Sequence, residues 1–314
     1  MAEPAALPYL ARDLPSPSPY MHKSRDRFIA ENLKRPRNED REDGRWYYNK
    51  NIRRSPWPPA LASLVSWLLI PIYAVQGLWV RGRVMRMAPA EGPREGWLGC
   101  APGDHAAVRL LIVGDSTAAS VGIDRSEDGL AAQLAKLVHE EAGRSVYWRA
   151  SGHNSAIAEE VRDHVVPQIE PRDWTHVVIT IGTNDTKNFH TVGRWKKGFG
   201  TLLYALHARF PGARLYWSEA VDPRDVPGLP APLAQIMRLR RDLINAMGQE
   251  LCFERDCTSV RPIPDVMPAG FCLDGFHASE EGYGHWARTI GDYVLADIAA
   301  EDAGRTHTSL QAAE

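Results

Sequence analysis

Four short segments of the chain carry groups that together could catalyse acyl transfer. They are, in sequence order, Gly114-Asp115-Ser116, Gly152, Gly182-Thr183-Asn184-Asp185 and Asp274-Gly275-Phe276-His277. Acyl transfer by a serine needs a hydroxyl, an imidazole that takes its proton, a carboxylate that holds the imidazole, and hydrogen-bond donors where negative charge develops. The segments offer a candidate for each role, so they predict a serine esterase.

Ser116 is the candidate nucleophile. It follows the apolar run 109–113, which predicts a strand, and the small residues 117–122 predict a turn after it. Ser116 is therefore expected at the carboxyl end of a strand, where open α/β sheets bind their ligands. An isolated Gly-Asp-Ser sequence is more often a plain turn, so the assignment depends on the other segments.

Asn184 and Gly152 are candidate oxyanion donors. The β-branched run 175–181 predicts a buried strand, and the side-chain amide of Asn184, just after it, can donate into a shared pocket. A further strand is predicted over 145–150, and Gly152 beyond it lets the backbone approach a ligand closely and present its N–H. An Asx turn that closes the strand is the alternative interpretation of Asn184.

Asp274 and His277 are the candidate carboxylate and base. Asp274 precedes His277 by three positions, a spacing that brings two side chains to one face of a helical turn. A carboxylate placed in this way fixes the tautomer of the imidazole and stabilises its protonated form. His277 is one of 11 histidines in the chain, and this partner singles it out.

With these segments the chain resembles the SGNH hydrolase family, also called GDSL esterases and lipases. The resemblance covers residues 108–299 as one catalytic domain. It implies Ser116 as nucleophile, with His277 and Asp274 completing the triad. It also implies an oxyanion hole formed by the backbone N–H groups of Ser116 and Gly152 and by the side chain of Asn184.

Two positions depart from the family pattern. Thr117 stands where the family's motif has Leu, and Ala278 stands where Pro often follows the histidine. Neither departure removes a reacting group, so both bear on the shape of the pocket. Asp115 is expected to support the turn of the nucleophile rather than to react.

The order of the expected elements indicates an α/β fold. Strands over 109–114, 145–150, 175–181 and 213–220 alternate with helices over 129–142, 156–168, 193–209, 233–250 and 280–299. This alternation predicts a mostly parallel sheet with helices on both faces, and the resemblance implies a flavodoxin-like three-layer sandwich. We expect helix ends at Gly143, Gly212 and Gly248 and an irregular loop over 222–232, which holds four prolines.

Composition and motifs disfavour other chemistries. The net charge is -2, which gives no electrostatic case for binding nucleic acid. The chain contains no Gly-x-Ser-x-Gly elbow, phosphate-binding loop or dinucleotide glycine motif. Its four cysteines and its histidines lack the spacing of a zinc site. We therefore expect no cofactor and no metal, and we favour free thiols over disulfides.

The N-terminal part is expected to differ from the catalytic domain. Residues 1–55 predict a disordered, basic segment, residues 81–107 a linker, and residues 300–314 a disordered tail. Residues 56–80 carry no charge and are rich in large apolar side chains, which makes them a membrane-anchor candidate containing one hydrophobic helix. A spanning helix, a monotopic anchor and a helix hairpin docked on the catalytic domain all remain open. Basic residues flank both ends, so the side of the membrane is not assigned.

The sequence thus predicts a membrane-associated serine ester hydrolase that forms an acyl-enzyme on Ser116. An O-acyltransferase that uses the same site is the first alternative, and a non-catalytic membrane-associated binding protein is the second. Lysophospholipids and other lipid esters, acetylated sugars, aryl esters and thioesters all remain candidate substrates. The oligomeric state is not assigned.

Overall fold

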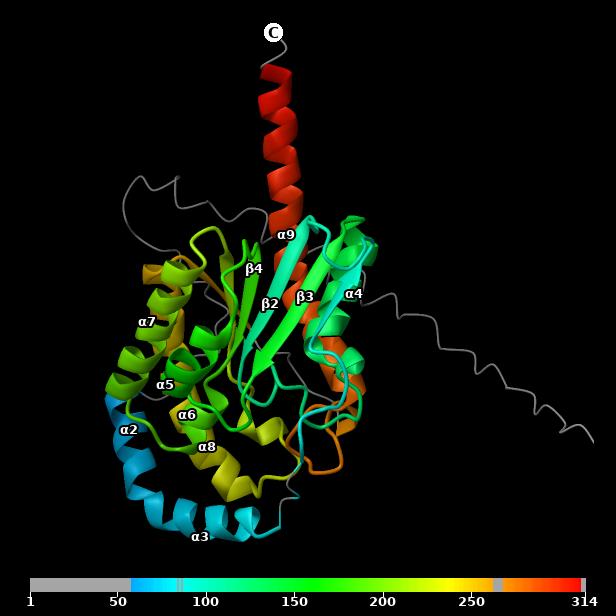
Figure 1. Ribbon diagram of the computed structural model, residues 1–314. Coiled ribbons are helices and arrows are strands. Elements are labelled where there is room, and N and C mark those ends of the chain that lie inside the picture. Colours follow the sequence, from blue (N-terminus) through cyan, green and yellow to red (C-terminus); the bar gives the residue numbers. More distant parts are fainter. Residues whose placement is uncertain (1–57, 84, 86, 262–267, 312–314) are drawn as a thin grey trace, which may run out of the picture. The chain divides into compact units, whose positions relative to one another are not determined.

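A six-stranded sheet forms the centre of the protein, for which the computed structural model describes residues 58–83, 85, 87–261 and 268–311. The segment 1–55 lies outside the described residues. In order across the sheet the strands are β1 (Glu95–Leu98), β3 (Val146–Gly152), β2 (Val108–Gly114), β4 (His176–Thr180), β5 (Arg214–Ser218) and β6 (Cys257–Val260) (Figure 1). Strand β1 is antiparallel to β3, and every other pair is parallel. The predicted α/β fold with a mostly parallel sheet is confirmed.

The strand order places a switch point between β2 and β4. Without β1 the order is that of flavodoxin-like sheets, in which the chain passes from the first strand to a neighbour on one side and then crosses to the other side. Ligands of such sheets bind beyond the carboxyl ends of the strands at this point. Ser116 follows β2 and Asn184 follows β4, so the two predicted site residues lie on either side of the switch point.

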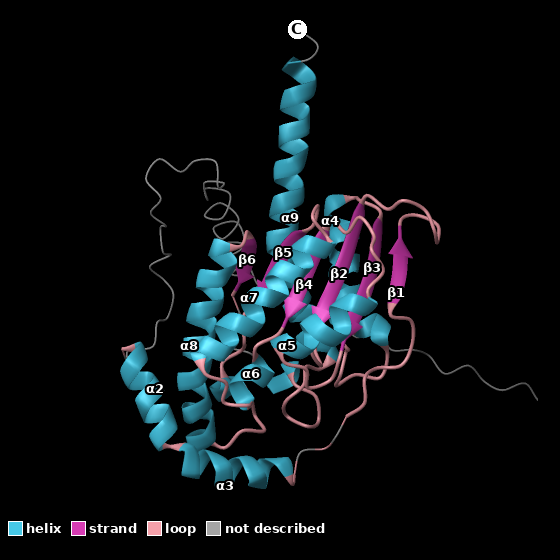
Figure 2. Cartoon of the chain, turned by 60° about the vertical axis from the view of Figure 1, so that its left-hand side comes forward, coloured by secondary structure: helices cyan, strands magenta, loops and turns pink. Residues whose placement is uncertain are grey.

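Helices cover both faces of the sheet (Figure 2). Helices α4 (Leu130–Ala142) and α9 (Glu280–Gln311) pack together on one face, and α7 (Val192–Arg209) and α8 (Ala231–Glu254) pack together on the other. Successive residues of a strand point to opposite faces, and both faces are apolar here because β2 and β4 are buried almost throughout. The sequence of a central strand that is covered on both faces is therefore a continuous hydrophobic run.

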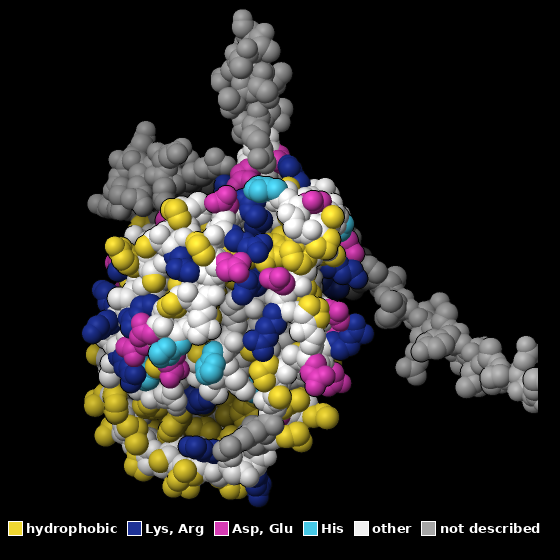
Figure 3. All heavy atoms as spheres, viewed as in Figure 1, with side chains coloured by type: hydrophobic (Ala, Val, Ile, Leu, Met, Phe, Trp, Pro, Cys, Tyr) yellow, Lys and Arg dark blue, Asp and Glu magenta, His cyan; other side chains and the backbone are white. Residues whose placement is uncertain are grey.

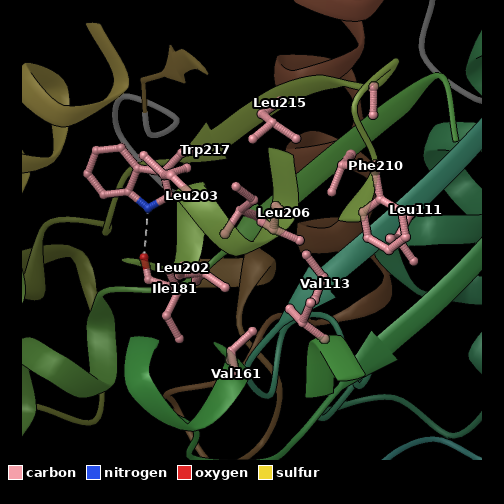
Figure 4. Close-up of a cluster of buried hydrophobic side chains, with 14 of the residues drawn as sticks. Leu111, Val113, Val161, Ile181, Leu202, Leu203, Leu206, Phe210, Leu215 and Trp217 are labelled. Atoms are coloured by element: carbon pink, nitrogen blue, oxygen red, sulfur yellow. Dashed lines mark hydrogen bonds between the residues drawn. The ribbon is translucent and has the colours of Figure 1, made fainter. Parts of the chain in front are cut away.

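The core between the sheet and α7 is built from strand side chains that interlock with one face of the helix (Figure 4). Leu111 and Val113 of β2 and Leu215 of β5 meet Leu203 and Leu206 of α7 in this cluster. The indole of Trp217 lies fully buried among them and donates a hydrogen bond of 2.9 Å to the carbonyl oxygen of Ile181. This bond ties β5 to the segment that leads into the predicted site.

Most expected helices are present, with local differences. Helix α4 ends at Gly143, whose φ of 62° is left-handed, as the sequence predicts. The prediction that a helix ends at Gly248 is wrong, because α8 continues through it to Glu254. Gly248 is required for packing instead: a Cβ there would lie 2.2 Å from the Trp217 ring.

The expected helix over 156–168 is broken into short pieces. A helical turn, α5 (Ala158–Glu160), is followed by a π-turn over Val161–Val165 and a 3₁₀ turn over Val166–Gln168. Pro167 has no N–H to continue an α-helical ladder, which accounts for the break near the end. The expected loop 222–232 holds a 3₁₀ turn over Pro223–Asp225, and α8 begins within it at Ala231.

Two helices replace the one hydrophobic helix expected over 56–80. Helix α2 (Pro59–Leu68) and helix α3 (Ile70–Arg81) meet at a bend of 63°. Pro71 stands in the first turn of α3, where a missing N–H is tolerated, but it cannot extend α2. Among the described residues no single helix has the length and apolarity to cross a bilayer, although the bent pair meets that criterion by length and composition.

Both segments flanking the catalytic domain differ from their expected form. The stretch 81–107, expected as a linker, contains β1, which forms the edge of the sheet. The tail 300–314, expected to be disordered, is helical as far as Gln311 because α9 continues into it. Strand β6 and the short helix α6 (Thr183–Lys187) are also present without having been predicted.

We expect Gly248→Ala to lower the free energy of unfolding by about 1–3 kcal/mol, because the new methyl group overlaps the rigid Trp217 ring. Gly193→Ala in α7 is the matched control, since a Cβ there meets nothing within 4 Å, and it should be neutral or stabilise by up to about 1 kcal/mol. Urea denaturation measures both. Equal stability of the two variants would contradict the packing assigned to Gly248.

Candidate active site

Ser116 lies in the turn that follows β2, and it is half-buried. The backbone comes very close to β4 just before it: a Cβ on Gly114 would lie 2.1 Å from the carbonyl oxygen of Thr180. The N–H of Asp115 donates a hydrogen bond of 3.0 Å to that same oxygen. Only glycine permits this approach, which places Ser116 at the carboxyl edge of the sheet.

The turn of Ser116 is held from two sides. The side chain of Asp115 accepts a hydrogen bond of 3.0 Å from the N–H of Thr117, so this carboxylate supports the turn. At the far end of the turn, the buried hydroxyl of Tyr283 on α9 donates a bond of 2.7 Å to the carbonyl oxygen of Val121. The N–H of Val121 in turn donates to the carbonyl oxygen of Ser116 at 3.0 Å. Tyr283 therefore fixes the far end of the turn that carries Ser116.

Gly152 lies at the end of β3, opposite Gly114 in the sheet register. A Cβ on Gly152 would lie 2.3 Å from the backbone nitrogen of Ala119 and 2.6 Å from the carbonyl oxygen of Asp115. The sequence predicted a glycine that lets the backbone approach a ligand. The structure shows that its nearest neighbour is the turn of Ser116 itself.

Asn184 lies in α6, one residue after the helix begins, and its side chain is buried. The preceding Gly182 has a φ of 124°, a conformation that side chains rarely adopt. The Nδ2 atom of Asn184 donates a hydrogen bond of 3.0 Å to the carbonyl oxygen of Ala156 and lies 3.5 Å from Oδ2 of Asp115. Asn184 is thus part of a helix rather than of a strand-closing Asx turn, and its amide points toward the segment of the nucleophile.

Asp274 and His277 are brought together as the spacing predicts. Oδ2 of Asp274 lies 2.6 Å from Nδ1 of His277, and Oδ1 accepts hydrogen bonds of 2.7 Å and 2.9 Å from the N–H groups of Phe276 and His277. The Asp274 side chain is fully buried, whereas that of His277 is 25% exposed. The carboxylate fixes the ring so that the far nitrogen, Nε2, is the one left for chemistry.

These bonds determine the charge of Asp274. Burial raises the pKa of its carboxyl, but the hydrogen bonds from the ring and N–H of His277 and from the N–H of Phe276 outweigh this, and the pKa lies below its ordinary value. Asp274 is therefore ionised at neutral pH. A fixed negative charge beside Nδ1 stabilises the imidazolium that forms when His277 accepts a proton.

The two halves of the site meet at Gly122. A Cβ on this glycine would lie 2.5 Å from the carbonyl oxygen of Ala278 and 2.9 Å from Cβ of His277. The end of the Ser116 turn thus packs directly against the His277 segment. No hydrogen bond joins Ser116 to His277 in the part of the chain that the structure describes, and such bonds commonly form only when substrate is bound.

The structure adds neighbours that sequence reasoning missed. Sγ of Cys272 donates a hydrogen bond of 3.1 Å to Oδ1 of Asp274, and its position two residues before the carboxylate was the available signal. Phe276, between Asp274 and His277, packs against residues of α3 and α8. Lys187 ends α6 three residues after Asn184, a helical spacing that could have marked it as a neighbour of the site.

No disulfide joins the four cysteines, Cys100, Cys252, Cys257 and Cys272. Within the described ranges, no cluster of three or more histidine, cysteine, aspartate or glutamate side chains could hold a metal ion.

Asp115 is buried, and its surroundings change the pKa of its carboxyl. Burial, together with the negative charge of Asp185, raises its pKa to about 6, although hydrogen bonds from Thr117 act in the opposite direction. A carboxyl whose pKa is higher in the folded protein binds more protons there than in the unfolded chain. Ionisation of Asp115 therefore lowers the stability of the fold as the pH rises from about 4 to about 6, above which the loss is complete.

We expect Asp115→Asn to remove this part of the pH dependence. Between pH 4 and pH 7 the free energy of unfolding of the variant should rise relative to that of the unaltered protein by about 2 kcal/mol, because the unaltered carboxyl must ionise in a buried position. Denaturation of both proteins across this pH range measures the difference. A difference that does not change with pH would contradict the raised pKa of Asp115.

The family model described as GDSL-like lipase/acylhydrolase matches residues 112–285. No curated protein matches the chain. Among solved structures, a family 3 carbohydrate esterase of Clostridium thermocellum is similar at 17% identity, with 62% of this chain and 98% of that chain covered and a TM-score of 0.48.

Two further structures are similar at the same level. A carbohydrate acetylesterase of Sinorhizobium meliloti has 17% identity, with 60% of this chain and 99% of that chain covered and a TM-score of 0.45. A lipase/acylhydrolase of Enterococcus faecalis has 17% identity, with 60% and 95% covered and a TM-score of 0.45. These similarities identify no substrate. The family match spans more than half of the chain and holds the Ser116, Asn184, Asp274 and His277 segments, so the chain belongs to the GDSL-like lipase/acylhydrolase family and is an SGNH-type ester hydrolase.

Proposed function

We propose that the protein hydrolyses esters through an acyl-enzyme on Ser116, with His277 as base and Asp274 as the carboxylate that orients it. The observation that carries this proposal is the 2.6 Å contact between Asp274 and His277, beside the turn that presents Ser116 at the switch point of the sheet. The carboxylate of Asp274 is buried and has a lowered pKa, and the imidazole of His277 is partly exposed. Both properties suit a base whose tautomer is fixed.

In the first step His277 takes the proton of the Ser116 hydroxyl as the oxygen attacks the ester carbonyl. The carbonyl oxygen becomes an oxyanion, and we assign it to the N–H groups of Ser116 and Gly152 and to the side-chain amide of Asn184. The bond from Asn184 to Ala156 fixes the plane of this amide, and the longer bond of 3.5 Å to Oδ2 of Asp115 is the one that the oxyanion would replace. Each such donor contributes roughly 3–4 kcal/mol of transition-state stabilisation.

Collapse of the tetrahedral intermediate expels the alcohol, which takes the proton from His277, and leaves the acyl group on Ser116. Water then attacks the acyl-enzyme while His277 again accepts a proton, and a second collapse releases the acid and restores the serine. If an alcohol acceptor replaced water in this step, the same site would act as an acyltransferase.

We expect Ser116→Ala to lower kcat/KM for a short aryl ester by about 10⁵–10⁶-fold, because the variant lacks the attacking oxygen. Ser155→Ala is the matched control: Ser155 is exposed, and its hydroxyl makes only a 3.4 Å bond to Asn154, so activity should be unchanged. Near-normal turnover by folded Ser116→Ala would disprove the assignment. Analysis of the products formed with added alcohol separates the alternatives. Transfer of the acyl group to the alcohol in preference to water would identify an acyltransferase. Absence of any turnover would identify a binding protein.

We further propose that α2 and α3 attach the protein to one leaflet of a membrane. Leu68, Val75 and Leu78 are each at least 70% exposed, and hydrophobic side chains gather at the edge of the molecule that these helices form (Figure 3). Neither helix contains an acidic residue, and α3 ends at Arg81, which suits an anionic lipid surface. The 63° bend between the helices favours this monotopic arrangement over a spanning one.

The side of these helices away from the exposed face packs on the catalytic domain. The rings of Trp67 and Tyr73 lie 5.8 Å and 4.6 Å from that of Phe189, and the Arg240 guanidinium lies 5.0 Å from the same ring. Val80 packs with Leu233 of α8. Membrane attachment through the exposed face would therefore hold the active site close to the lipid surface.

We expect Leu68→Glu, Val75→Glu and Leu78→Glu each to weaken binding of the full chain to phosphatidylglycerol vesicles by at least about tenfold. Burial of one such apolar side chain contributes about 1.5–3 kcal/mol, and the new charge opposes insertion. Tyr204→Glu on α7 is the control, because Tyr204 is 69% exposed and lies outside α2 and α3. Hydrolysis of a soluble short ester should be unchanged. Unaltered vesicle flotation of the three variants, or none for the unaltered protein, would contradict the attachment.

A further inference from the structure

The short helix α6, which carries Asn184, ends in an unusual turn. Two bonds of a Schellman motif close it: the N–H of Phe189 donates to the carbonyl oxygen of Thr186, and the N–H of His190 donates to that of Asp185, each at 3.0 Å. The motif needs a residue in the left-handed conformation, usually glycine, and here that residue is Phe189, with a φ of 57°. A backbone strained in this way persists only where the surrounding structure holds it.

The ring of Phe189 makes the contacts that hold this turn. The half-buried ring lies 4.6 Å from that of Tyr73 on α3 and 5.8 Å from that of Trp67 on α2. The guanidinium of Arg240 on α8 lies 5.0 Å from the same ring. Glycine would fit the backbone with less strain but could make none of these contacts. The side chain at this position therefore attaches the end of α6 to α2, α3 and α8.

Two polar groups of the same elements bind the carbonyl groups of the turn. The hydroxyl of Tyr73 donates a hydrogen bond to the carbonyl oxygen of Lys187, the last residue of α6. The buried guanidinium of Arg240 donates to the carbonyl oxygens of Phe189 and His190. Carbonyl groups at the end of a helix have no partner within it, so these donors from outside α6 fix where the helix ends.

The turn is connected to the amide of Asn184 through Asp185. Nδ1 of the buried His190 lies 3.0 Å from Oδ1 of Asp185, and Oδ2 of Asp185 accepts a hydrogen bond of 3.3 Å from the N–H of Ala158. The side chain of Asn184 donates to Ala156 in the same segment. Helix α6 has only five residues, too few to be stable without such contacts. Its position is therefore set on one side by that segment and on the other by the turn that follows it.

We propose that Phe189, Tyr73 and Arg240 are positioning residues for the oxyanion hole, because they hold the end of α6 so that the amide of Asn184 meets the oxyanion. This inference rests on the proposed hydrolase function and makes the two N-terminal helices part of its catalytic support. The docked face of α2 and α3 acts on the reaction, whereas their exposed face acts on membrane attachment. An oxyanion donor matters mainly in the transition state, so loosening α6 is expected to lower kcat and to leave KM nearly unchanged.

We expect Phe189→Gly to lower kcat for a short aryl ester by about tenfold or more, because glycine keeps the left-handed turn but removes the ring contacts. Tyr73→Phe should lower kcat by about three- to tenfold, because only the hydroxyl is lost; it carries the test if Phe189→Gly does not fold. Tyr204→Phe is the control, since Tyr204 is 69% exposed on α7, and its kcat should not change. Unaltered kcat in folded Phe189→Gly or in Tyr73→Phe, or a change confined to KM, would overturn the proposal.

A double-mutant cycle with Asn184→Ala separates positioning from general destabilisation. Asn184→Ala alone should lower kcat by about 10²–10³-fold, which leaves a measurable rate. If the turn acts through the amide of Asn184, Phe189→Gly or Tyr73→Phe should have little further effect once that amide is absent. An undiminished loss of kcat in the Asn184→Ala background would show that the contacts only stabilise the fold, and it would overturn the proposal.

Amide hydrogen exchange of residues 183–190 tests the same contacts without turnover. Tyr73→Phe in the full chain should speed exchange of these amides by about three- to tenfold, because one bond that holds the end of α6 is lost. Tyr204→Phe should leave the exchange rates unchanged. Unchanged exchange in Tyr73→Phe would overturn the positioning role. Faster exchange in a protein that hydrolyses no ester would overturn the hydrolase assignment alone.

Discussion

The active site depends on the close approach of backbone at the carboxyl ends of β2, β3 and β4. A Cβ on Gly114 would lie 2.1 Å from the carbonyl oxygen of Thr180, and one on Gly152 would lie 2.3 Å from the nitrogen of Ala119. Without side chains at these two positions, the turn of Ser116 can sit directly on the neighbouring strand ends. The same closeness brings Asn184 to within 3.5 Å of Asp115. Any side chain at either glycine would push the turn of Ser116 away from the neighbouring strand ends.

The second half of the site is held by one carboxylate with several donors. Asp274 binds the ring and the N–H of His277, the N–H of Phe276 and the thiol of Cys272. The turn therefore cannot change shape without leaving a buried charge unpaired, a costly state. Helix α9 connects this half to the first. Tyr283 lies in the first turn of α9, and its hydroxyl donates a hydrogen bond to Val121 at the end of the Ser116 turn. The relative position of Ser116 and His277 is thus a property of the packed fold rather than of either loop.

Sequence reasoning predicted those features that depend on local pattern. The runs around Ile112 and Val178 predicted central strands, because strands buried on both faces are continuously apolar. The Asp274 and His277 pair was predicted from its spacing on a helical turn, but the structure brings the two side chains together in a non-helical turn in which Gly275 has a φ of 71°. Strands β1 and β6 were not predicted, because each has only four residues and shows no clear alternation of apolar and polar side chains. The docking of α3 depends on Tyr73 and Phe189, which are far apart in sequence, and no local pattern in the chain indicates that contact. Gly248 appeared to end a helix because its reason for being glycine, the Trp217 ring, comes from another element.

The central claim is that Ser116 is a nucleophile activated by His277. Reaction of the full chain with a fluorophosphonate, followed by mass spectrometry of the intact protein and its peptides, tests this claim most directly, because the probe bonds only to an activated hydroxyl. We expect one adduct per chain, on Ser116, and a labelling rate that falls by at least about 10²-fold in His277→Gln. An adduct on another residue, or a labelling rate at Ser116 that His277→Gln leaves unchanged, would contradict it.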